Sequence, residues 1–199
     1  MRIGLFGGTF DPPHIGHQIL AAEAQQQLSL ERVLWIVTPD PPHKQGQPIS
    51  PVAQRVALVR AVTDADPAFE LCTVELERPG PHYARDTLQI LQGRYPTAEL
   101  FYLIGQDSLR DLPTWHDPQG LLAACAGLGV MRRPGVQTDL TALEAQLPGL
   151  QQRLHWIETP LIEISARDLR QRIASGAAYR YYLPAAVAAL VQANDWYRR

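Results

Sequence analysis

The sequence predicts an α/β protein in which helices cover both faces of a doubly wound parallel sheet. Short apolar runs, typical of buried strands, alternate with segments rich in Ala, Leu and Gln that are typical of helices. The first strand ends in a double-glycine turn that leads toward a helix. The chain has 199 residues, of which 46% are hydrophobic, enough for one sizeable core. We therefore expect a single domain over residues 1–199, with the C-terminal helical part, about residues 165–199, packed against it.

The chain opens with a strand that ends in a glycine turn. Residues 3–6 form an apolar run that suits a buried strand of a parallel sheet. Gly7 and Gly8 follow, and paired glycines let the backbone turn sharply and let a ligand approach the main chain. Thr9 adds a hydroxyl to the same loop. We therefore expect this turn to contact a ligand.

Two histidines come next, at the expected start of a helix. Proline suits the first helical turn, so the helix is expected to begin near Pro13 and to run to Leu28. His14 and His17 would then share one helix face near the N-terminus, where free N–H groups and the helix dipole favour an anion. Taken alone, such a pair is more often a solvated face, and its spacing differs from that of zinc proteases. Together with the glycine loop, it predicts a phosphate site.

A second strand and a proline-rich loop follow this helix. Residues 32–38 predict a buried strand that ends in PDPPHKQGQPISP, where the prolines exclude regular structure. This loop lies at the carboxyl end of its strand, where ligands bind in open α/β sheets. It carries His43 and Lys44, and Lys44 is either a point charge for phosphate or a solvated loop charge. Ser50 is expected to cap a helix through Asp64.

The next unit predicts another free helix N-terminus. Residues 69–77 alternate between apolar and polar side chains and predict a third strand. A helix expected from about Ala84 would leave the N–H groups near Tyr83, Ala84 and Arg85 without intrahelical partners. These N–H groups could bind an acceptor.

A second strand, glycine and helix unit resembles the first one. Residues 100–104 predict a fourth strand that is stopped by Gly105, and Asp107 follows at the start of another helix. Trp115 and His116 come soon after, in a polar and proline-flanked loop. A tryptophan in such a loop is suited to stacking on a flat heterocycle, or it belongs to the core; the sequence favours neither.

The remaining strands and helices complete the alternation. Residues 128–131 predict a fifth strand that ends in adjacent arginines, of which Arg133 suits phosphate recognition. Residues 138–147 predict a peripheral helix, residues 155–157 a last strand, and a closing helix is expected from Pro184.

Another helix N-terminus is expected shortly before the closing helix. Ser165 and Asp168 form a variant of the capping box, and Gly176 is a plausible stop signal. Arg167 and Arg170 lie three positions apart on the helix between them. This segment therefore predicts further contacts to an anion.

Composition excludes several classes of protein. The net charge of −2 argues against a general nucleic-acid binder. Cys72 and Cys125 fall in apolar runs and are expected to be buried free thiols, as in a reducing cytoplasm. The sequence shows neither a signal-peptide pattern nor a long apolar segment, so we expect a cytoplasmic protein without a membrane span.

The compound motif GGTFDP followed by His-x-Gly-His resembles the signature of the nucleotidyltransferase superfamily. The fingerprints of P-loop enzymes and of dinucleotide dehydrogenases are missing from the sequence. Over nearly its full length the chain is similar to the bacterial nicotinate-nucleotide adenylyltransferases. The blocks that carry this resemblance are GGTFDPPHIGH, PPHK, SPVAQR, ELERPGPHYARDTL, LIGQDSLRDLPTWHD, RRPG, ISARDLR and YYLPAAV.

The resemblance implies a Rossmann-like nucleotidyltransferase fold and a reaction. That reaction is transfer of AMP from ATP to nicotinate mononucleotide, giving nicotinate adenine dinucleotide (deamido-NAD) and pyrophosphate in NAD biosynthesis. Mg²⁺ would be bound mainly through the ATP phosphates, with few protein ligands. The partners implied are small molecules, without nucleic acid or membrane, and the sequence leaves open whether the chain forms a homo-oligomer.

The resemblance also implies three groups of site residues. The catalytic residues would be His14, His17 and Arg170. ATP would be bound by Gly7, Gly8, Thr9, Phe10, Gly105, Asp107, Ser165 and Arg167. The acceptor substrate would be bound by His43, Lys44, Tyr83, Ala84, Trp115, His116 and Arg133.

The chain departs from the family pattern at two places. Ala166 and Arg167 stand where the family has Ser and Thr hydroxyls, and the segment His82 to Ala84 replaces Ser-Tyr-Thr. These changes matter little if backbone N–H groups make the contacts. If side chains make them, the alternative is that Arg167 compensates on the phosphate side. Two rival functions stay open: another His-x-Gly-His nucleotidyltransferase, with pantetheine phosphate or glycerol phosphate as acceptor, and a non-catalytic nucleotide sensor.

Overall fold

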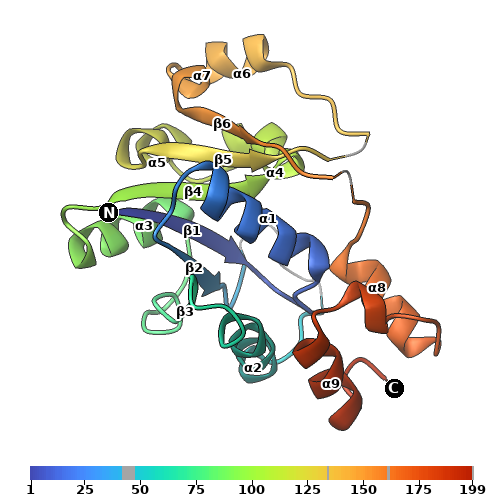
Figure 1. The fold of residues 1–199 in the computed structure, drawn as a ribbon. Coiled ribbons are helices and arrows are strands. Elements are labelled where there is room, and N and C mark those ends of the chain that lie inside the picture. The colour runs from blue at the N-terminus through green and yellow to red at the C-terminus, as the bar shows by residue number, and fades with distance from the viewer. Residues whose placement is uncertain (42–47, 134, 161, 199) are drawn as a thin grey trace.

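A computed structural model describes residues 1–41, 48–133, 135–160 and 162–198. Within these ranges a parallel six-stranded sheet has the strand order β3-β2-β1-β4-β5-β6 (Figure 1). The strands are β1 (Arg2–Gly8), β2 (Arg32–Val37), β3 (Phe69–Cys72), β4 (Glu99–Gly105), β5 (Gly127–Met131) and β6 (Leu154–Ile157).

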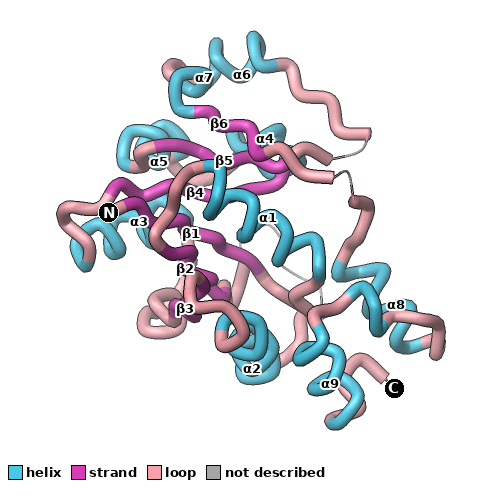
Figure 2. Tube along the Cα trace, viewed as in Figure 1, coloured by secondary structure: helices cyan, strands magenta, loops and turns pink. Residues whose placement is uncertain are grey.

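Helices connect these strands and cover both faces of the sheet (Figure 2). The α-helices are α1 (Ile15–Gln27), α2 (Val52–Thr63), α3 (Ala84–Arg94), α4 (Gln106–Asp111), α5 (Pro118–Ala124), α6 (Leu140–Gln146), α7 (Leu150–Arg153), α8 (Ala166–Ala174) and α9 (Ala185–Ala193). Short 3₁₀ turns occur at η2 (Leu112–Thr114) and η3 (Arg180–Tyr182). This architecture confirms the predicted doubly wound α/β fold.

Two hydrophobic clusters bury the two faces of the sheet. Side chains of α1, α2, α8 and α9 pack in one cluster, and side chains of α3 to α7 pack in the other. Successive strand residues point to opposite faces, so Leu5 belongs to the second cluster and Phe6 to the first. The C-terminal helices contribute Leu169 and Val187 to the same cluster as Phe6.

The strand order reverses at the centre of the sheet. β1 pairs with β2 on one side and with β4 on the other, so the connections to the two neighbours run in opposite directions. The carboxyl ends of the strands on either side of such a reversal form a crevice where ligands bind in open α/β sheets. The glycines that end β1 and β4 are therefore placed at this crevice.

The expected end of the third strand and the expected cap of α2 were wrong. The third strand stops at Cys72 rather than at Glu77, because a turn comes next in which the Leu76 N–H donates to the Thr73 carbonyl at 2.8 Å. Ser50 does not cap α2: Pro51 occupies that position, and the Ser50 N–H instead donates to the Asp11 carboxylate.

The expected cap of α8 and the expected burial of both cysteines agree with the structure. α8 begins directly after Ser165, whose Oγ accepts the Asp168 N–H at 3.1 Å. Cys72 and Cys125 are buried free thiols, and burial raises the pKa of both. No helix within the described ranges is long and apolar enough to cross a membrane.

Candidate active site

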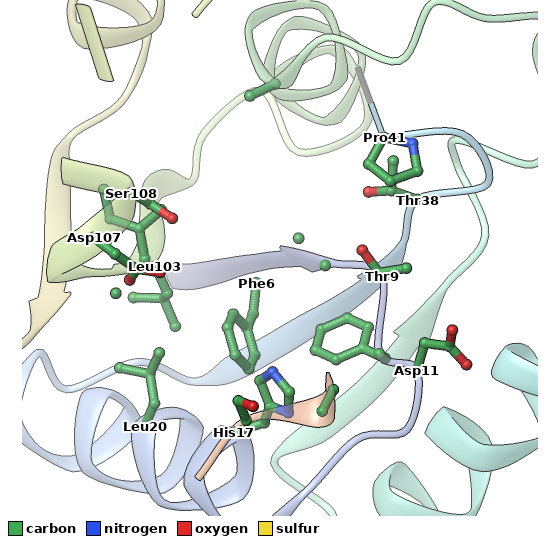
Figure 3. Close-up of a pocket in the computed structure, with 18 of the residues that line it drawn as sticks. Phe6, Thr9, Asp11, His17, Leu20, Thr38, Pro41, Leu103, Asp107 and Ser108 are labelled. Carbon is green, nitrogen blue, oxygen red and sulfur yellow. The ribbon is translucent and has the colours of Figure 1, made fainter. Parts of the chain in front are cut away.

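A cavity of about 880 Å³ opens at the carboxyl ends of the central strands. This volume is large enough for two mononucleotides. Predicted site residues from several separate segments of the chain meet in its lining. Figure 3 shows Thr9, His17 and Asp107 among the residues around it. The predicted site residues in the lining are Gly7, Gly8, Thr9, Phe10, His14, His17, Tyr83, Ala84, Gly105, Asp107, Trp115, His116, Arg133, Ser165, Arg167 and Arg170. His43 and Lys44 lie outside the described residues.

The first wall of the cavity is the turn between β1 and α1. The helix begins at Ile15 rather than near Pro13, so His14 is its N-cap and His17 stands in its first turn. The predicted proximity of the two imidazoles holds all the same: their ring centroids lie 3.6 Å apart in a stacked arrangement.

A hydrogen bond fixes the protonation pattern of His17. The His14 backbone N–H donates to His17 Nδ1 at 3.1 Å. In a neutral imidazole the nitrogen that accepts carries no proton, so the proton of His17 is on Nε2. The N–H donor of the His17 ring is therefore at Nε2.

His14 is kept neutral by its surroundings. Its side chain is 3% exposed, and burial, aided by the charge of Arg133, lowers its pKa to about 3. Its Nδ1 is buried without a hydrogen-bond partner among the described residues. The ring passes so close to Gly16 that a Cβ there would lie 3.2 Å from His14 Nδ1, which explains why glycine stands between the histidines.

The second wall is the junction of β4 and α4, where the helix follows the strand without a connecting loop. Gly105 ends β4 and caps α4, and a Cβ at this position would lie 2.5 Å from Asp107 Oδ1. Asp107 Oδ1 lies 3.3 Å from Arg133 Nε, and both side chains are partly exposed. A residue expected to face ATP is thus paired with one expected to face the acceptor.

Gln106 is a buried residue that the sequence did not reveal as part of the site. Its Oε1 accepts the Arg133 backbone N–H at 3.0 Å, and its Nε2 donates to the Val136 carbonyl at 3.0 Å. Gln106 thereby ties the segment that carries Arg133 to the start of α4. Its place between the strand-ending glycine and Asp107 is the one signal that could have revealed it.

The third wall combines the N-terminus of α3 with the loop after α4. Tyr83 is the N-cap of α3 and stacks on His116, with ring centroids 4.0 Å apart. Trp115 is half-buried and meets Tyr102 edge to face at 6.1 Å. The first-turn N–H groups of α3 have no intrahelical acceptor, as predicted, because α3 begins at Ala84.

Two buried titratable residues behind this wall were also missed from the sequence. Glu75 is 3% exposed and accepts a hydrogen bond from the Thr87 hydroxyl at 2.6 Å, and burial raises its pKa. His82 is 7% exposed, and burial lowers its pKa. Both line the cavity. Glu75 was overlooked because residues 69–77 were expected to be a strand, whereas Glu75 lies in the turn after β3.

The fourth wall is the N-terminus of α8. Ser165 uses its oxygen to cap the helix, and its hydroxyl proton stays able to donate. Arg167 is exposed in the first turn of α8. Arg170 Nη1 donates to the Asp11 carbonyl at 2.6 Å, so this arginine holds the loop between β1 and α1 while it lines the cavity.

The cavity offers no ready-made metal cage. Within the part of the chain that the structure describes, no group of three or more His, Cys, Asp or Glu side chains is placed to hold a metal ion. Two of the carboxylates that line the cavity are also paired with arginines, Asp107 with Arg133 and Asp11 with Arg170.

Comparison with known proteins agrees with this geometry. The Cytidylyltransferase-like family profile matches residues 5–172. A protein of Thermomicrobium roseum described as "Probable nicotinate-nucleotide adenylyltransferase" is 44% identical over 99% of this chain and 92% of its own length. A protein of Thermus thermophilus with the same description is 38% identical over the full length of both chains.

Solved structures agree on the fold. Plasmodium falciparum nicotinic acid mononucleotide adenylyltransferase complexed with NaAD superposes with a TM-score of 0.81, at 14% identity, over 98% of this chain and 97% of that one. The same enzyme complexed with APC gives a TM-score of 0.79. The full-length relatives, the matching profile and the cavity lined by the signature histidines lead to one assignment. This chain belongs to the nicotinate-nucleotide adenylyltransferase family of the cytidylyltransferase-like proteins.

Proposed function

We propose that this protein transfers the adenylyl group of ATP to nicotinate mononucleotide, giving nicotinate adenine dinucleotide and pyrophosphate in NAD biosynthesis. The names of its full-length relatives support this substrate pair. The observation that carries the proposal is the stacked histidine pair at the N-terminus of α1, inside a cavity large enough for both nucleotides.

The chemistry needs charge stabilisation rather than a base. A 5′-phosphate oxygen of the mononucleotide attacks the α-phosphorus of ATP, and the bond from that phosphorus to the bridging oxygen breaks. The nucleophile is already an anion, so no proton has to be removed and no covalent intermediate is required. Catalysis then depends on preorganised donors that face the charge developing on the phosphates.

The first wall supplies such donors. His17 is proposed to donate from Nε2–H, which its hydrogen bond to the His14 main chain selects. His14 is proposed to act as a neutral donor, because its pKa of about 3 leaves it uncharged near neutral pH. Strand β1 runs through Gly8 rather than ending before Gly7, so the segment from Thr9 to the N-terminus of α1 is proposed to add the main-chain N–H groups that favour the same anion.

The fourth wall is proposed to receive the leaving pyrophosphate. Arg170, Arg167 and Ser165 line the cavity at the N-terminus of α8. The hydroxyls lost at Ala166 and Arg167 are replaced in this proposal by the first-turn N–H groups of α8 and by the Arg167 guanidinium. Mg²⁺ bound to ATP would neutralise part of the phosphate charge, and the residues of this wall would bind the remaining charge of the pyrophosphate.

The second and third walls are proposed to hold the rest of the substrates. Gly105 and Asp107 would line the ribose and adenine side of ATP, and Arg133 would bind the acceptor phosphate. Trp115 would stack on the pyridine ring. The pyridine carboxylate would accept from the N–H groups near Ala84 at the start of α3, where no acceptor within the helix competes.

A coupled pyrophosphate assay with several acceptors tests this proposal. We expect kcat/KM for nicotinate mononucleotide to exceed that for nicotinamide mononucleotide by about 10³-fold or more, because the amide NH₂ would face N–H donors and leave them unpaired. Trp115→Ala should weaken both acceptors through lost stacking. Faster turnover of pantetheine phosphate or glycerol phosphate, or nucleotide binding without pyrophosphate release, would overturn the assignment.

A further inference from the structure

Arg55 is a fully buried arginine to which the proposed reaction gives no role. It belongs to the SPVAQR block, lies on α2 and is 1% exposed. Its guanidinium donates to four main-chain carbonyls and so joins three separate segments of the chain. The acceptors are the carbonyls of Ser50 at 3.0 Å from Nε, Thr9 at 2.9 Å and Thr38 at 2.7 Å from Nη1, and Pro39 at 2.9 Å from Nη2.

Asp11 forms the second half of the same buried network. It is 4% exposed, and in Figure 3 its carboxylate is turned away from His17. Its Oδ2 accepts the Ser50 N–H at 3.1 Å, and its Oδ1 accepts the Tyr197 hydroxyl at 2.8 Å. Tyr197 lies near the C-terminus, so the end of the chain is fastened to the loop that precedes α1.

Asp11 places a negative charge near two arginines: it acts electrostatically on Arg55 and pairs with Arg170 at 3.8 Å. Burial lowers the pKa of Arg55, and the neighbouring Asp11 opposes this shift. Burial and Asp11 together raise the pKa of Tyr197, so its phenol stays a hydrogen-bond donor. A buried arginine and carboxylate are costly to keep unless their hydrogen bonds are made. Here Arg55 donates to loop carbonyls, and Asp11 accepts from the Ser50 N–H and from the Tyr197 hydroxyl.

This arrangement orients two peptide groups of the cavity rim. The Thr9 and Pro39 carbonyls point at the Arg55 guanidinium. Since both peptide groups are trans and planar, the N–H groups of Phe10 and Asp40 point away from it. Phe10 also packs edge to face on His17, with ring centroids 5.2 Å apart. The network therefore fixes the conformation of the loop between β1 and α1 from the side that faces away from the cavity.

We infer that Asp11, Arg55 and Tyr197, here called the loop clamp, are positioning residues for adenylyl transfer. Arg55 and Tyr197 are not among the described residues that line the cavity, so they act through the loop. This inference rests on the proposed function. It predicts that loosening the clamp lowers turnover more than it weakens substrate binding, because misplacement of reacting groups by about 1 Å costs up to about 10²-fold in rate.

Kinetics of Arg55→Lys, Arg55→Met and Tyr197→Phe test the clamp. Lysine keeps the positive charge but cannot donate to all four carbonyls at once, and methionine donates to none. We therefore expect both Arg55 variants to lose about 10²-fold in kcat. Tyr197→Phe removes a single hydroxyl and should lose about 10-fold in kcat, with KM for ATP and for nicotinate mononucleotide within about twofold of wild type. Tyr181→Phe is the matched control, because Tyr181 is 86% exposed.

The outcomes separate the clamp from the function on which it rests. An inactive wild type would refute the proposed function. If the wild type is active and Tyr197→Phe has an unchanged kcat, the clamp is overturned. A wild-type kcat in Arg55→Lys would also overturn it, because only the positive charge of Arg55 and not its hydrogen-bond geometry would then matter. If the Arg55 variants do not fold, Tyr197→Phe decides. Hydrogen exchange of residues 9–14 gives a readout besides activity: it should be faster in Tyr197→Phe and unchanged in Tyr181→Phe.

Discussion

The two central strand and helix units differ in how their polar groups are held. Between β1 and α1 the chain inserts residues 9–14, whereas α4 comes directly after β4. The first unit presents His14, which burial keeps neutral, and His17, whose Nδ1 accepts a main-chain hydrogen bond. The second unit presents a carboxylate paired with Arg133. The longer connection is fixed from outside by α2 and the C-terminus, while the short junction is fixed by sheet register and Gln106. The two units thus differ both in the length of the connection after the strand and in the polar groups that they present to the cavity.

The largest expected effect tests the first unit. His17→Ala should lower kcat by about 10²-fold or more with the fold kept, because a preorganised donor to the developing phosphate charge is lost. Steady-state kinetics and a thermal melt measure both quantities. His155→Ala is the matched control, since His155 is exposed on the edge strand β6. Unchanged turnover in His17→Ala would refute the proposed mechanism. The first unit would then no longer differ from the second in supplying a catalytic donor.

The fold and the first unit were the most predictable parts of the molecule. Apolar runs that alternate with helical segments indicate a parallel sheet, and the glycines of β1 and β4 mark the carboxyl edge. Local signals of this kind also gave the start of α3 and the Ser165 cap of α8. The proximity of His14 and His17 follows from their spacing at a helix start, even though the helix begins two residues later than expected.

The contacts between distant segments were not predictable in the same way. Arg55 looks like one polar position of an amphipathic helix until β1, β2 and α2 are assembled around it. Tyr197 meets Asp11 across almost the whole length of the chain. Glu75 was hidden by an alternating pattern that favours a strand, although the strand ends at Cys72. Each of these roles depends on tertiary packing, which no local pattern encodes.

A smaller effect tests the second unit. Arg133→Ala should raise KM for nicotinate mononucleotide about 10-fold, and KM for ATP less, because hydrogen bonds to a charged group are worth about 1.5–3 kcal/mol. Arg132→Ala is a matched control: Arg132 packs over the Trp156 ring at 4.1 Å and is not among the described cavity residues. Equal changes in both KM values would mean that Arg133 serves the pairing with Asp107 rather than the acceptor phosphate.

The smallest effect is a pH-dependent stability that only the first unit should show. The pKa of His14 falls from 6.5 to about 3 on folding. As the pH drops, the His14 imidazole is therefore protonated in the unfolded chain before it is protonated in the folded one. The stabilisation is therefore complete above about pH 6.5 and is lost progressively as the pH falls toward 3. Between pH 8 and pH 5.5 the loss amounts to about 1.4 kcal/mol, or about 4 °C in Tm for a chain of this size.

The measurement compares wild type with His14→Asn in thermal melts over this pH range. Asparagine does not titrate, so the Tm of wild type should fall relative to that of His14→Asn as the pH is lowered. The lowered pKa of His82 acts in the same direction in both proteins and cancels in the difference. A difference in Tm that stays constant from pH 8 to pH 5.5 would show that His14 is not held neutral by burial. The neutral-donor role proposed for it at the first wall would then have to be replaced by that of a cation.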